Sequence, residues 1–188
     1  MKENFYIFLD IDGVLWDWKY RISAIKEGKA SKSGIISSFN PKSIDALNNL
    51  IALLDQNFSP ELVISSTWRE NMFATKKALY KNGLEFDKPI NCTPRHLNPF
   101  FRGKEILEYL DSVGHTENYV VIDDGSFDFS NTLNKNNIIK TNIASGSLTN
   151  SHIKKYISSH PEITEEKETS TEISCDFLPQ SEECSEKI

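Results

Sequence analysis

Three clusters of acidic or hydroxyl side chains each follow a short apolar run in this chain. The clusters are Asp10 with Asp12, then Ser65, Ser66 and Thr67, and finally Asp123 with Asp124. In doubly wound parallel sheets, ligands bind beyond the carboxyl ends of the strands. The clusters therefore predict one shared site at one edge of a sheet. The alternative is that Asp and Ser serve only as turn formers where strands end, which explains the serines alone more easily than all three clusters.

The spacing of Asp10 and Asp12 suits metal-assisted chemistry on phosphorus. Residues two apart in an extended segment point to the same side, so both carboxylates can face one site. Close carboxylates repel, and one takes up a proton unless a cation lies between them. Mg²⁺ prefers oxygen ligands, and Asp124 or Asp123 would supply a further carboxylate. Asp10 could then stay ionised as a nucleophile, with Asp12 as general acid and general base. Gly13 lets the backbone turn tightly beside them.

A phosphoryl group in transfer also needs donors and positive charge around its oxygens. Ser65 or Ser66 could supply a hydroxyl, and Arg102 or Lys104, in the segment RGKEI, could supply a cation. The alternative for each basic residue is an ordinary solvated helix start.

Trp68 and Arg69 directly follow the hydroxyl cluster. Arg69 could bind a second phosphate or a carboxylate, and Trp68 could stack on a nucleobase. Alternatively, Trp68 belongs to the core and Arg69 to a structural ion pair. Both interpretations stay open for this pair.

Apolar runs and helical periodicities alternate along the chain. Strands are predicted at 5–11, 61–65, 89–92, 118–122 and 137–140, and helices at 40–54, 70–81, 103–112 and 149–158. Strands that are nearly continuous in apolar residues and are joined by long crossovers indicate a parallel sheet covered on both faces. The predicted fold class is α/β, a three-layer doubly wound parallel sheet.

Composition divides the chain near residue 160. We expect one folded domain over residues 1–160. Residues 161–188 carry nine acidic residues and two lysines, with little apolar periodicity, so we expect an acidic, disordered tail. The whole chain has a net charge of −6, which leaves about +1 for the domain. That balance is far from the basic footprint of a dedicated nucleic-acid binder. The polar residues 17–39 predict a flap or small cap after the first strand, or else a solvated loop.

The three cysteines, Cys92, Cys175 and Cys184, show no paired spacing. They argue against a disulfide framework or a zinc site and favour a reducing compartment. The apolar run at 5–9 is too short for a secretion signal, and no segment approaches the roughly 20 apolar residues of a membrane span. We therefore expect a soluble, cytoplasmic protein without a membrane partner, and the sequence leaves its oligomeric state open.

The motifs FLDIDGVLW, VISSTWR, RGKEI and VVIDDG, taken together, resemble the haloacid dehalogenase (HAD) superfamily of phosphohydrolases over roughly residues 5–160. The resemblance implies a HAD-like Rossmannoid fold and Mg²⁺-dependent hydrolysis of phosphomonoesters through an aspartyl-phosphate. It also implies a role for each candidate: Asp10 as nucleophile, Asp12 as acid/base with its main-chain carbonyl on the metal, Ser65 or Ser66 as the phosphate-binding hydroxyl, Arg102 or else Lys104 as the basic residue, and Asp124 with Asp123 as metal ligands.

A narrower resemblance rests on SSTWR, RGKEI and IDD. This combination is similar to the HAD domains of Swiss Army Knife RNA repair proteins, for which a phosphatase role on nucleic-acid ends has been suggested. It implies a phosphorylated substrate such as a nucleotide or a polynucleotide end.

Two other functions stay open. A receiver-like phospho-acceptor domain also combines a parallel sheet, an acidic cluster, a hydroxyl and a Lys, but its adjacent acidic pair comes early, whereas Asp123 and Asp124 come late. A catalytically silent HAD fold used for binding is the other alternative, and the presence of every candidate catalytic group argues against it.

Overall fold

The computed structural model describes residues 2–28, 38–98, 100–144 and 146–164. In these ranges five strands form one all-parallel sheet in the spatial order β3-β2-β1-β4-β5. The strands are β1 Asn4–Leu9, β2 Ser59–Ile64, β3 Asn91–Cys92, β4 Tyr119–Asp123 and β5 Ile138–Lys140. From the central β1 the chain winds outward to β3 and then crosses back to β4 and β5. The predicted doubly wound parallel sheet is confirmed.

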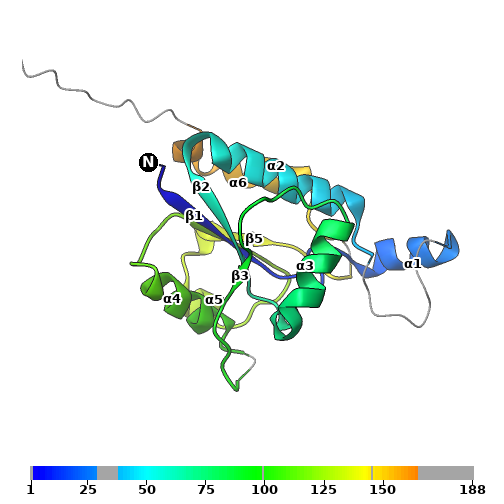
Figure 1. Ribbon diagram of the computed structural model, residues 1–188, viewed down its shortest axis with the longest axis horizontal. Helices are drawn as coiled ribbons and strands as arrows, with labels where there is room; N and C mark the ends of the chain where they lie inside the picture. The colour runs from blue at the N-terminus through cyan, green and yellow to red at the C-terminus, as the bar shows by residue number, and fades with distance from the viewer. Residues whose placement is uncertain (1, 29–37, 99, 145, 165–188) are drawn as a thin grey trace, which may run out of the picture.

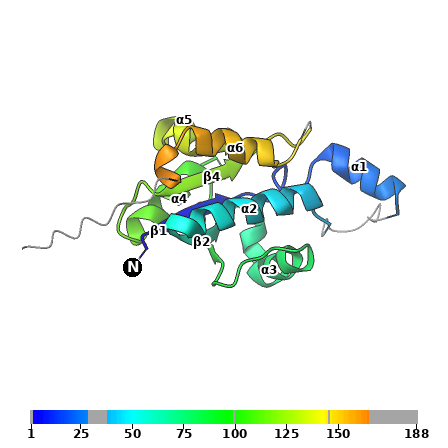
Figure 2. The ribbon, with the colours of Figure 1, turned by 90° about the horizontal axis from the view of Figure 1, so that it is seen from above.

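Helices cover both faces of the sheet and make the fold three-layered. In Figure 1, α2 and α6 lie side by side over one face, and α4 with α5 lies over the other. Figure 2 shows α1 projecting from the body beyond the starts of α2 and α6. The helices are α1 Trp18–Lys26, α2 Pro41–Asn57, α3 Met72–Lys81, α4 Arg102–Ser112, α5 Phe129–Thr132 and α6 Asn150–Ser158, and the 3₁₀ turns are η1 Thr67–Asn71, η2 Lys135–Asn137 and η3 Pro161–Ile163.

Alternation along β1 divides the apolar core in two. Phe5, Ile7 and Leu9 pack in one cluster with residues of α2, α3 and α6. Tyr6 and Phe8 pack in the other with residues of α4 and α5. Burial on both faces explains why this strand is a continuous apolar run in the sequence. The same alternation directs the next residue, the candidate nucleophile, toward the α4 side.

Helix α1 occupies the start of residues 17–39, where the sequence predicted a flap or small cap or else a solvated loop. The Asp17 side chain caps it by accepting a hydrogen bond from the Tyr20 amide at 2.9 Å. Only Ala24 of this helix is buried, so no apolar stripe marked it in the sequence. Residues 29–37 of the predicted flap lie outside the described residues. Elsewhere, the helix predicted at 70–81 divides into η1 and α3, and α5 was not predicted.

The packed body continues past the boundary expected at residue 160. Ile163 in η3 is 1% exposed and belongs to the core cluster under α2 and α6. Its carbonyl accepts a hydrogen bond from Asn57 Nδ2 at 3.0 Å. The remainder of the predicted tail, 165–188, lies outside the described residues. None of the helices in the described ranges combines the length and the apolar character that crossing a membrane requires.

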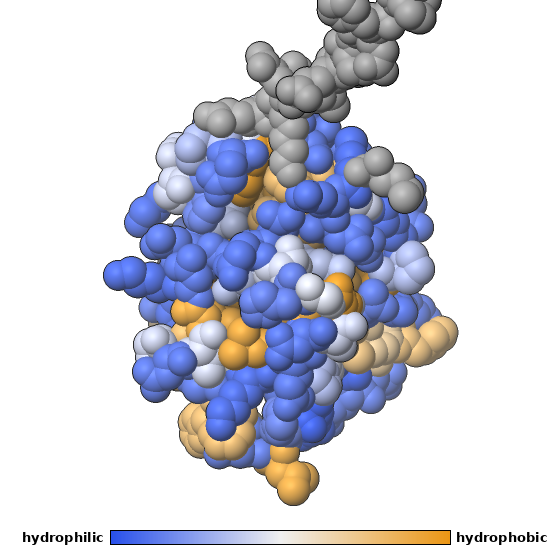
Figure 3. Space-filling model, turned by 90° about the vertical axis from the view of Figure 1, so that its left-hand side faces the viewer, coloured by the Kyte–Doolittle hydropathy of each residue, from blue (hydrophilic) through white to orange (hydrophobic). Residues whose placement is uncertain are grey.

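The side of the body where β1 begins faces the viewer in Figure 3. This surface is mainly hydrophilic, and apolar side chains show on it in small areas. The polar clusters predicted from the sequence lie at the opposite edge, where the strands end.

Candidate active site

The predicted clusters meet in one row across the carboxyl edge of the sheet. The ladders continue one residue past β1 and β2, because the amides of Asp10 and Ser65 each donate to a neighbouring strand at 3.0 Å. Extending the register by this residue aligns Thr93, Ser65, Asp10 and Asp123, and Lys140 pairs with Asp123. We call these five residues the carboxyl-edge row. Residues aligned in a parallel sheet share a face, so their side chains extend on the α4 side.

Arg102, the first residue of α4, links two buried carboxylates of this row. Its Nη1 lies 2.9 Å from Asp10 Oδ1 and 2.7 Å from Asp123 Oδ2. Burial raises the pKa of Asp10 to about 7; the charge of Asp123 adds to this shift, while Arg102 and a hydrogen bond with Ser66 oppose it. Burial also raises the pKa of Asp123. Burial by itself would lower the pKa of Arg102, but the two carboxylates outweigh it and raise that pKa. One guanidinium for two carboxylates leaves negative charge to be balanced.

Asp10, Asp123 and Asp124 together form a donor set that suits a divalent cation. Each offers one carboxylate oxygen, and these oxygens all lie within 4.8 Å of one another. A set of oxygen ligands with uncompensated negative charge fits Mg²⁺ better than a soft metal. Gly13 allows the turn after β1 to approach closely, because a Cβ at that position would lie only 2.4 Å from Asp124 Oδ2. The residues present therefore fit the ion that the sequence predicted.

The two candidate serines differ in what their hydroxyls contact. Ser65 Oγ is fully buried and has no hydrogen-bond partner among the described residues, and the same is true of Thr93 Oγ1 beside it. Ser66 Oγ accepts a hydrogen bond from the Trp68 amide, capping η1, and is also hydrogen-bonded to Asp10. A buried polar group without a partner costs about 1–3 kcal/mol. Ser65 therefore retains unused hydrogen-bonding capacity in the described structure, whereas the Ser66 hydroxyl is engaged.

Asp12 lies on the turn after β1, where two indole groups hold its carboxylate. Trp16 Nε1 lies 2.9 Å from Oδ1, and Trp68 Nε1 lies 3.1 Å from Oδ1 and 3.2 Å from Oδ2. The Trp68 ring packs against Phe39 with ring centroids 5.7 Å apart, at the margin of the larger core cluster. Trp68 therefore packs against the core, as the alternative interpretation of this residue expected, and also contacts the predicted acid/base, which neither interpretation predicted.

Arg69 forms an internal ion pair. Its Nη2 lies 2.8 Å from Glu105 Oε2, and its Nη1 donates to the Ser65 carbonyl at 2.5 Å. The side chains of Arg69 and Glu105 are only 8% and 3% exposed. Glu105 also accepts a hydrogen bond from the His96 amide at 2.8 Å. These contacts pair Nη1 and Nη2 of Arg69 with protein groups, as the structural ion-pair interpretation expects, whereas its buried Nε has no partner among the described residues.

Asp128 fixes the start of α4 and with it the position of Arg102. Its Oδ1 accepts from the Gly103 amide at 2.6 Å and its Oδ2 from the Lys104 amide at 3.2 Å. These are amides that a helix start leaves without intrahelical partners. The Lys104 side chain is exposed, with Nζ 4.0 Å from the centroid of the Phe101 ring. Of the two basic candidates, the structure brings Arg102 to the carboxylates and keeps Lys104 apart from them.

Five residues of this arrangement were not among the predicted site residues: Trp16, Thr93, Glu105, Asp128 and Lys140. Trp16 stands four residues after Asp12 in the same motif, and that short distance was a usable signal. Thr93 directly follows the strand predicted at 89–92, so its place at a strand end was a second one. Glu105 and Asp128 bind partners far along the chain, Arg69 and the start of α4, and no local sequence pattern predicts such contacts.

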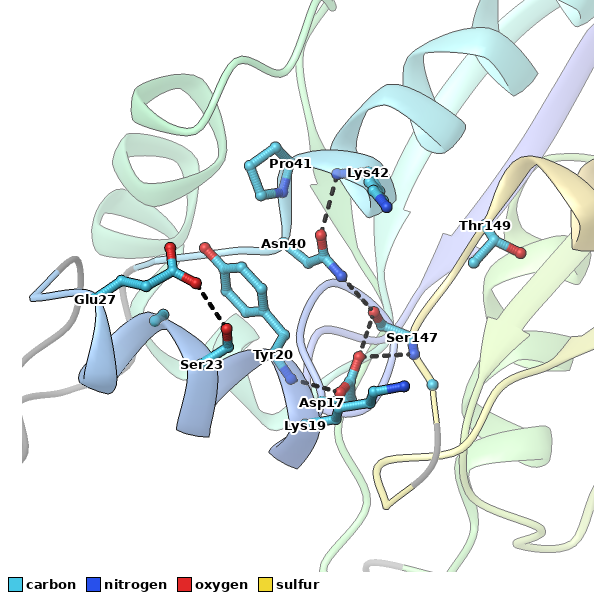
Figure 4. Close-up of a pocket in the computed structure, with 12 residues that line it drawn as sticks. Asp17, Lys19, Tyr20, Ser23, Glu27, Asn40, Pro41, Lys42, Ser147 and Thr149 are labelled. Atoms are coloured by element: carbon cyan, nitrogen blue, oxygen red, sulfur yellow. Dashed lines mark hydrogen bonds between the residues drawn. The ribbon is translucent and has the colours of Figure 1, made fainter.

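A hollow of about 620 Å³ lies between α1 and the starts of α2 and α6 (Figure 4). The Asp17 side chain lines this hollow and accepts hydrogen bonds from the Ser147 amide at 3.0 Å and the Ser147 hydroxyl at 2.8 Å. Burial acts to raise the pKa of Asp17, but hydrogen bonds from Tyr20 and Ser147 outweigh it and lower that pKa. Asn40 caps α2 and donates to Ser147 Oγ at 3.3 Å. The polar groups here satisfy one another and tether α1 to the body.

Comparison with known protein families gives a match over most of the chain. The family described as the HAD domain in Swiss Army Knife RNA repair proteins matches residues 6–153, a range that contains the carboxyl-edge row, Arg102 and both tryptophans around Asp12. Comparisons with curated proteins and with solved structures gave no significant match. HAD membership indicates a phosphatase-type hydrolase, and the cluster of Asp carboxylates is of a kind that could bind a metal. The chain belongs to the family of HAD domains found in Swiss Army Knife RNA repair proteins.

Proposed function

We propose that this protein is a Mg²⁺-dependent phosphomonoesterase that forms an aspartyl-phosphate on Asp10. One observation carries the proposal: carboxylate oxygens of Asp10, Asp123 and Asp124 lie within 4.8 Å of one another. Two of these residues are almost fully buried, and carboxylates at that depth require a compensating positive charge. Acidic residues that served only as turn formers would be solvated and would not need to be buried.

The metal site would consist of Asp10, Asp123, Asp124 and, as the family likeness implies, the main-chain carbonyl of Asp12. Bound there, Mg²⁺ would supply positive charge that keeps Asp10 ionised and offsets the charge of the phosphoryl oxygens. Arg102 adds a fixed positive charge beside Asp10 that no change of pH removes.

The chain's own residues divide the remaining work. Asp10 attacks phosphorus as the bond to the leaving oxygen breaks, and Asp12 donates a proton to that oxygen. The Ser65 hydroxyl donates a hydrogen bond to a phosphoryl oxygen. Asp12 then removes a proton from the attacking water, whose oxygen displaces Asp10 and releases inorganic phosphate. Asp12 thereby regains its proton, and Asp10 returns as the free carboxylate.

We propose a nucleotide or a polynucleotide end as the substrate. The description of the family, as domains of RNA repair proteins, supports this choice. The predicted domain carries a charge of about +1, so it does not repel a polyanion.

The test is hydrolysis of p-nitrophenyl phosphate with Mg²⁺ and with EDTA. We expect turnover with Mg²⁺ only, and a loss of at least about 1,000-fold in the Asp10→Asn variant. Asp45→Asn, on the exposed side of α2, is the matched control. Equal metal-dependent turnover by Asp10→Asn would remove Asp10 as the nucleophile. A panel of nucleotides, 3′- and 5′-phosphorylated oligonucleotides, sugar phosphates and phosphopeptides then tests the substrate class.

A further inference from the structure

The carboxylate of Asp12 is held by two groups that can only donate hydrogen bonds. Indole N–H is a donor without acceptor capacity. Oδ1 accepts from both Trp16, at 2.9 Å, and Trp68, at 3.1 Å, whereas Oδ2 has only the 3.2 Å contact with Trp68. A carboxylate offers about four lone-pair directions, so Oδ2 retains the greater capacity for a further partner.

We propose that Trp16 and Trp68 form a clamp that positions Asp12 for proton transfer, with Oδ2 as the oxygen that exchanges the proton. Both tryptophans are positioning residues, because they act through Asp12 and need not touch the substrate. The proposal rests on the proposed function, in which Asp12 serves as acid and base.

The two sides of the clamp come from separate segments, and each is fixed by its own packing. Trp16 is 4% exposed, its ring meets that of Trp18 at 5.4 Å edge-to-face, and the Arg21 guanidinium lies 5.8 Å from its centroid. Trp68 lies in η1, where its carbonyl accepts from Thr75 Oγ1 at 2.8 Å. Because both indoles are anchored, they restrict the Asp12 side chain to one orientation.

Orientation matters because proton transfer requires heavy atoms within roughly 2.6–3.2 Å of each other. Asp12 lies on a turn and is only partly buried, so the backbone alone does not fix its side chain. A displacement of about 1 Å can reduce a rate on the order of 100-fold. The competing explanation is that Asp12 merely satisfies two indoles that belong to the core, in which case their N–H groups add nothing to turnover.

The Trp68→Phe variant separates these explanations, since it retains an aromatic ring beside Phe39 and removes the N–H. We compare kcat/KM for phenyl phosphate and p-nitrophenyl phosphate, whose leaving groups have similar shape but differ in basicity. Phenolate, the more basic, needs the proton from Asp12. We expect a fall of about 10- to 100-fold for phenyl phosphate and of less than about threefold for p-nitrophenyl phosphate. Tyr80→Phe, which removes an exposed hydroxyl donor on α3 and retains its ring, is the control and should leave both values unchanged.

A double-mutant cycle and a spectroscopic measurement complete the test. In an Asp12→Ala background, Trp68→Phe should cause no further loss, because its effect passes through Asp12. The chain has three tryptophans, so its ¹H–¹⁵N spectrum shows three indole resonances. Asp12→Ala should shift those of Trp16 and Trp68, whose N–H groups lose their acceptor, by more than that of Trp18.

The outcomes distinguish the clamp from the proposed function. Equal losses for both esters in Trp68→Phe, or a further loss in the Asp12→Ala background, would overturn the clamp and leave the phosphatase intact. Unshifted indole resonances in Asp12→Ala would also overturn it. A wild-type protein that hydrolyses neither ester in Mg²⁺ would overturn the proposed function and the clamp with it.

Discussion

Replacing Gly13 with alanine perturbs the proposed metal site through one backbone position. A Cβ at Gly13 would lie 2.4 Å from Oδ2 and 2.5 Å from Cγ of Asp124, whereas such contacts essentially never fall below 3.0 Å. The Asp124 carboxylate must therefore move by more than half an ångström. Gly13 also has φ of +76°, a conformation that costs an alanine roughly 1–2 kcal/mol.

Gly28 separates the clash from the backbone strain. It has φ of +70°, and nothing lies within 4 Å of a Cβ added there. Gly13→Ala and Gly28→Ala should therefore share a strain cost of roughly 1–2 kcal/mol in the free energy of unfolding. Only Gly13→Ala should lose Mg²⁺ affinity, by about 10- to 100-fold or roughly 1.4–2.8 kcal/mol, because Mg²⁺ demands near-ideal ligand geometry.

The assay is isothermal titration of chelator-treated protein with MgCl₂, together with urea unfolding in EDTA. Equal Mg²⁺ affinities in Gly13→Ala and Gly28→Ala would refute the placement of Asp124 as a ligand held beside the turn after β1. Equal loss of unfolding free energy with unequal affinity is the expected pattern.

Three further predictions concern the buried polar groups. Ser65→Ala should leave the free energy of unfolding in urea unchanged or slightly higher, since its hydroxyl has no partner in the described structure, but should lower kcat about 10- to 100-fold. Ser66→Ala should instead lose about 1 kcal/mol of stability, because it removes the cap of η1. The reversed pattern would exchange the roles of the two serines. Glu105→Gln breaks the ion pair with Arg69, in which the Glu105 side chain is 3% exposed, and should lower the free energy of unfolding by about 3–5 kcal/mol. Glu70→Gln breaks the pair with Arg95, in which Glu70 is 53% exposed, and should lower it by less than about 1 kcal/mol. Similar losses for both variants in urea would contradict this ranking. In EDTA, the Asp10 contribution to stability should fall as pH rises from near 3.8, where the unfolded carboxyl ionises, to about 7, where the buried one does, because the folded state holds the extra proton in that window; Asp10→Asn should lose this slope.

The sequence was sufficient for the features that rest on burial and on strand ends. Continuous apolar runs marked β1, β2 and β4 because both faces of these strands are covered, and each run ended at a cluster that the sheet brings into the carboxyl-edge row. Because these strands are parallel and aligned, the residues that follow them lie side by side.

Features that depend on single capping or pairing contacts could not be predicted in this way. Helix α1 buries one residue and owes its start to Asp17, so it carries no periodic signal. The choice between Arg102 and Lys104 depends on which residue of one helical turn faces the sheet, and Asp128, from a distant segment, sets that rotation. Arg69 pairs with Glu105, which lies far along the chain, so the sequence could suggest a structural ion pair but could not identify its partner.

The bridge from Arg102 to Asp10 and Asp123 also bears on how the newly made chain reaches its folded state. In domains whose ligands repel one another without their ion, the metal must arrive before the structure can close. Here a guanidinium already lies between two of the acidic groups, so the polypeptide itself supplies part of the positive charge that they require. On the proposed function, folding can precede metal capture, and scarcity of magnesium during synthesis would leave the domain folded but without its ion.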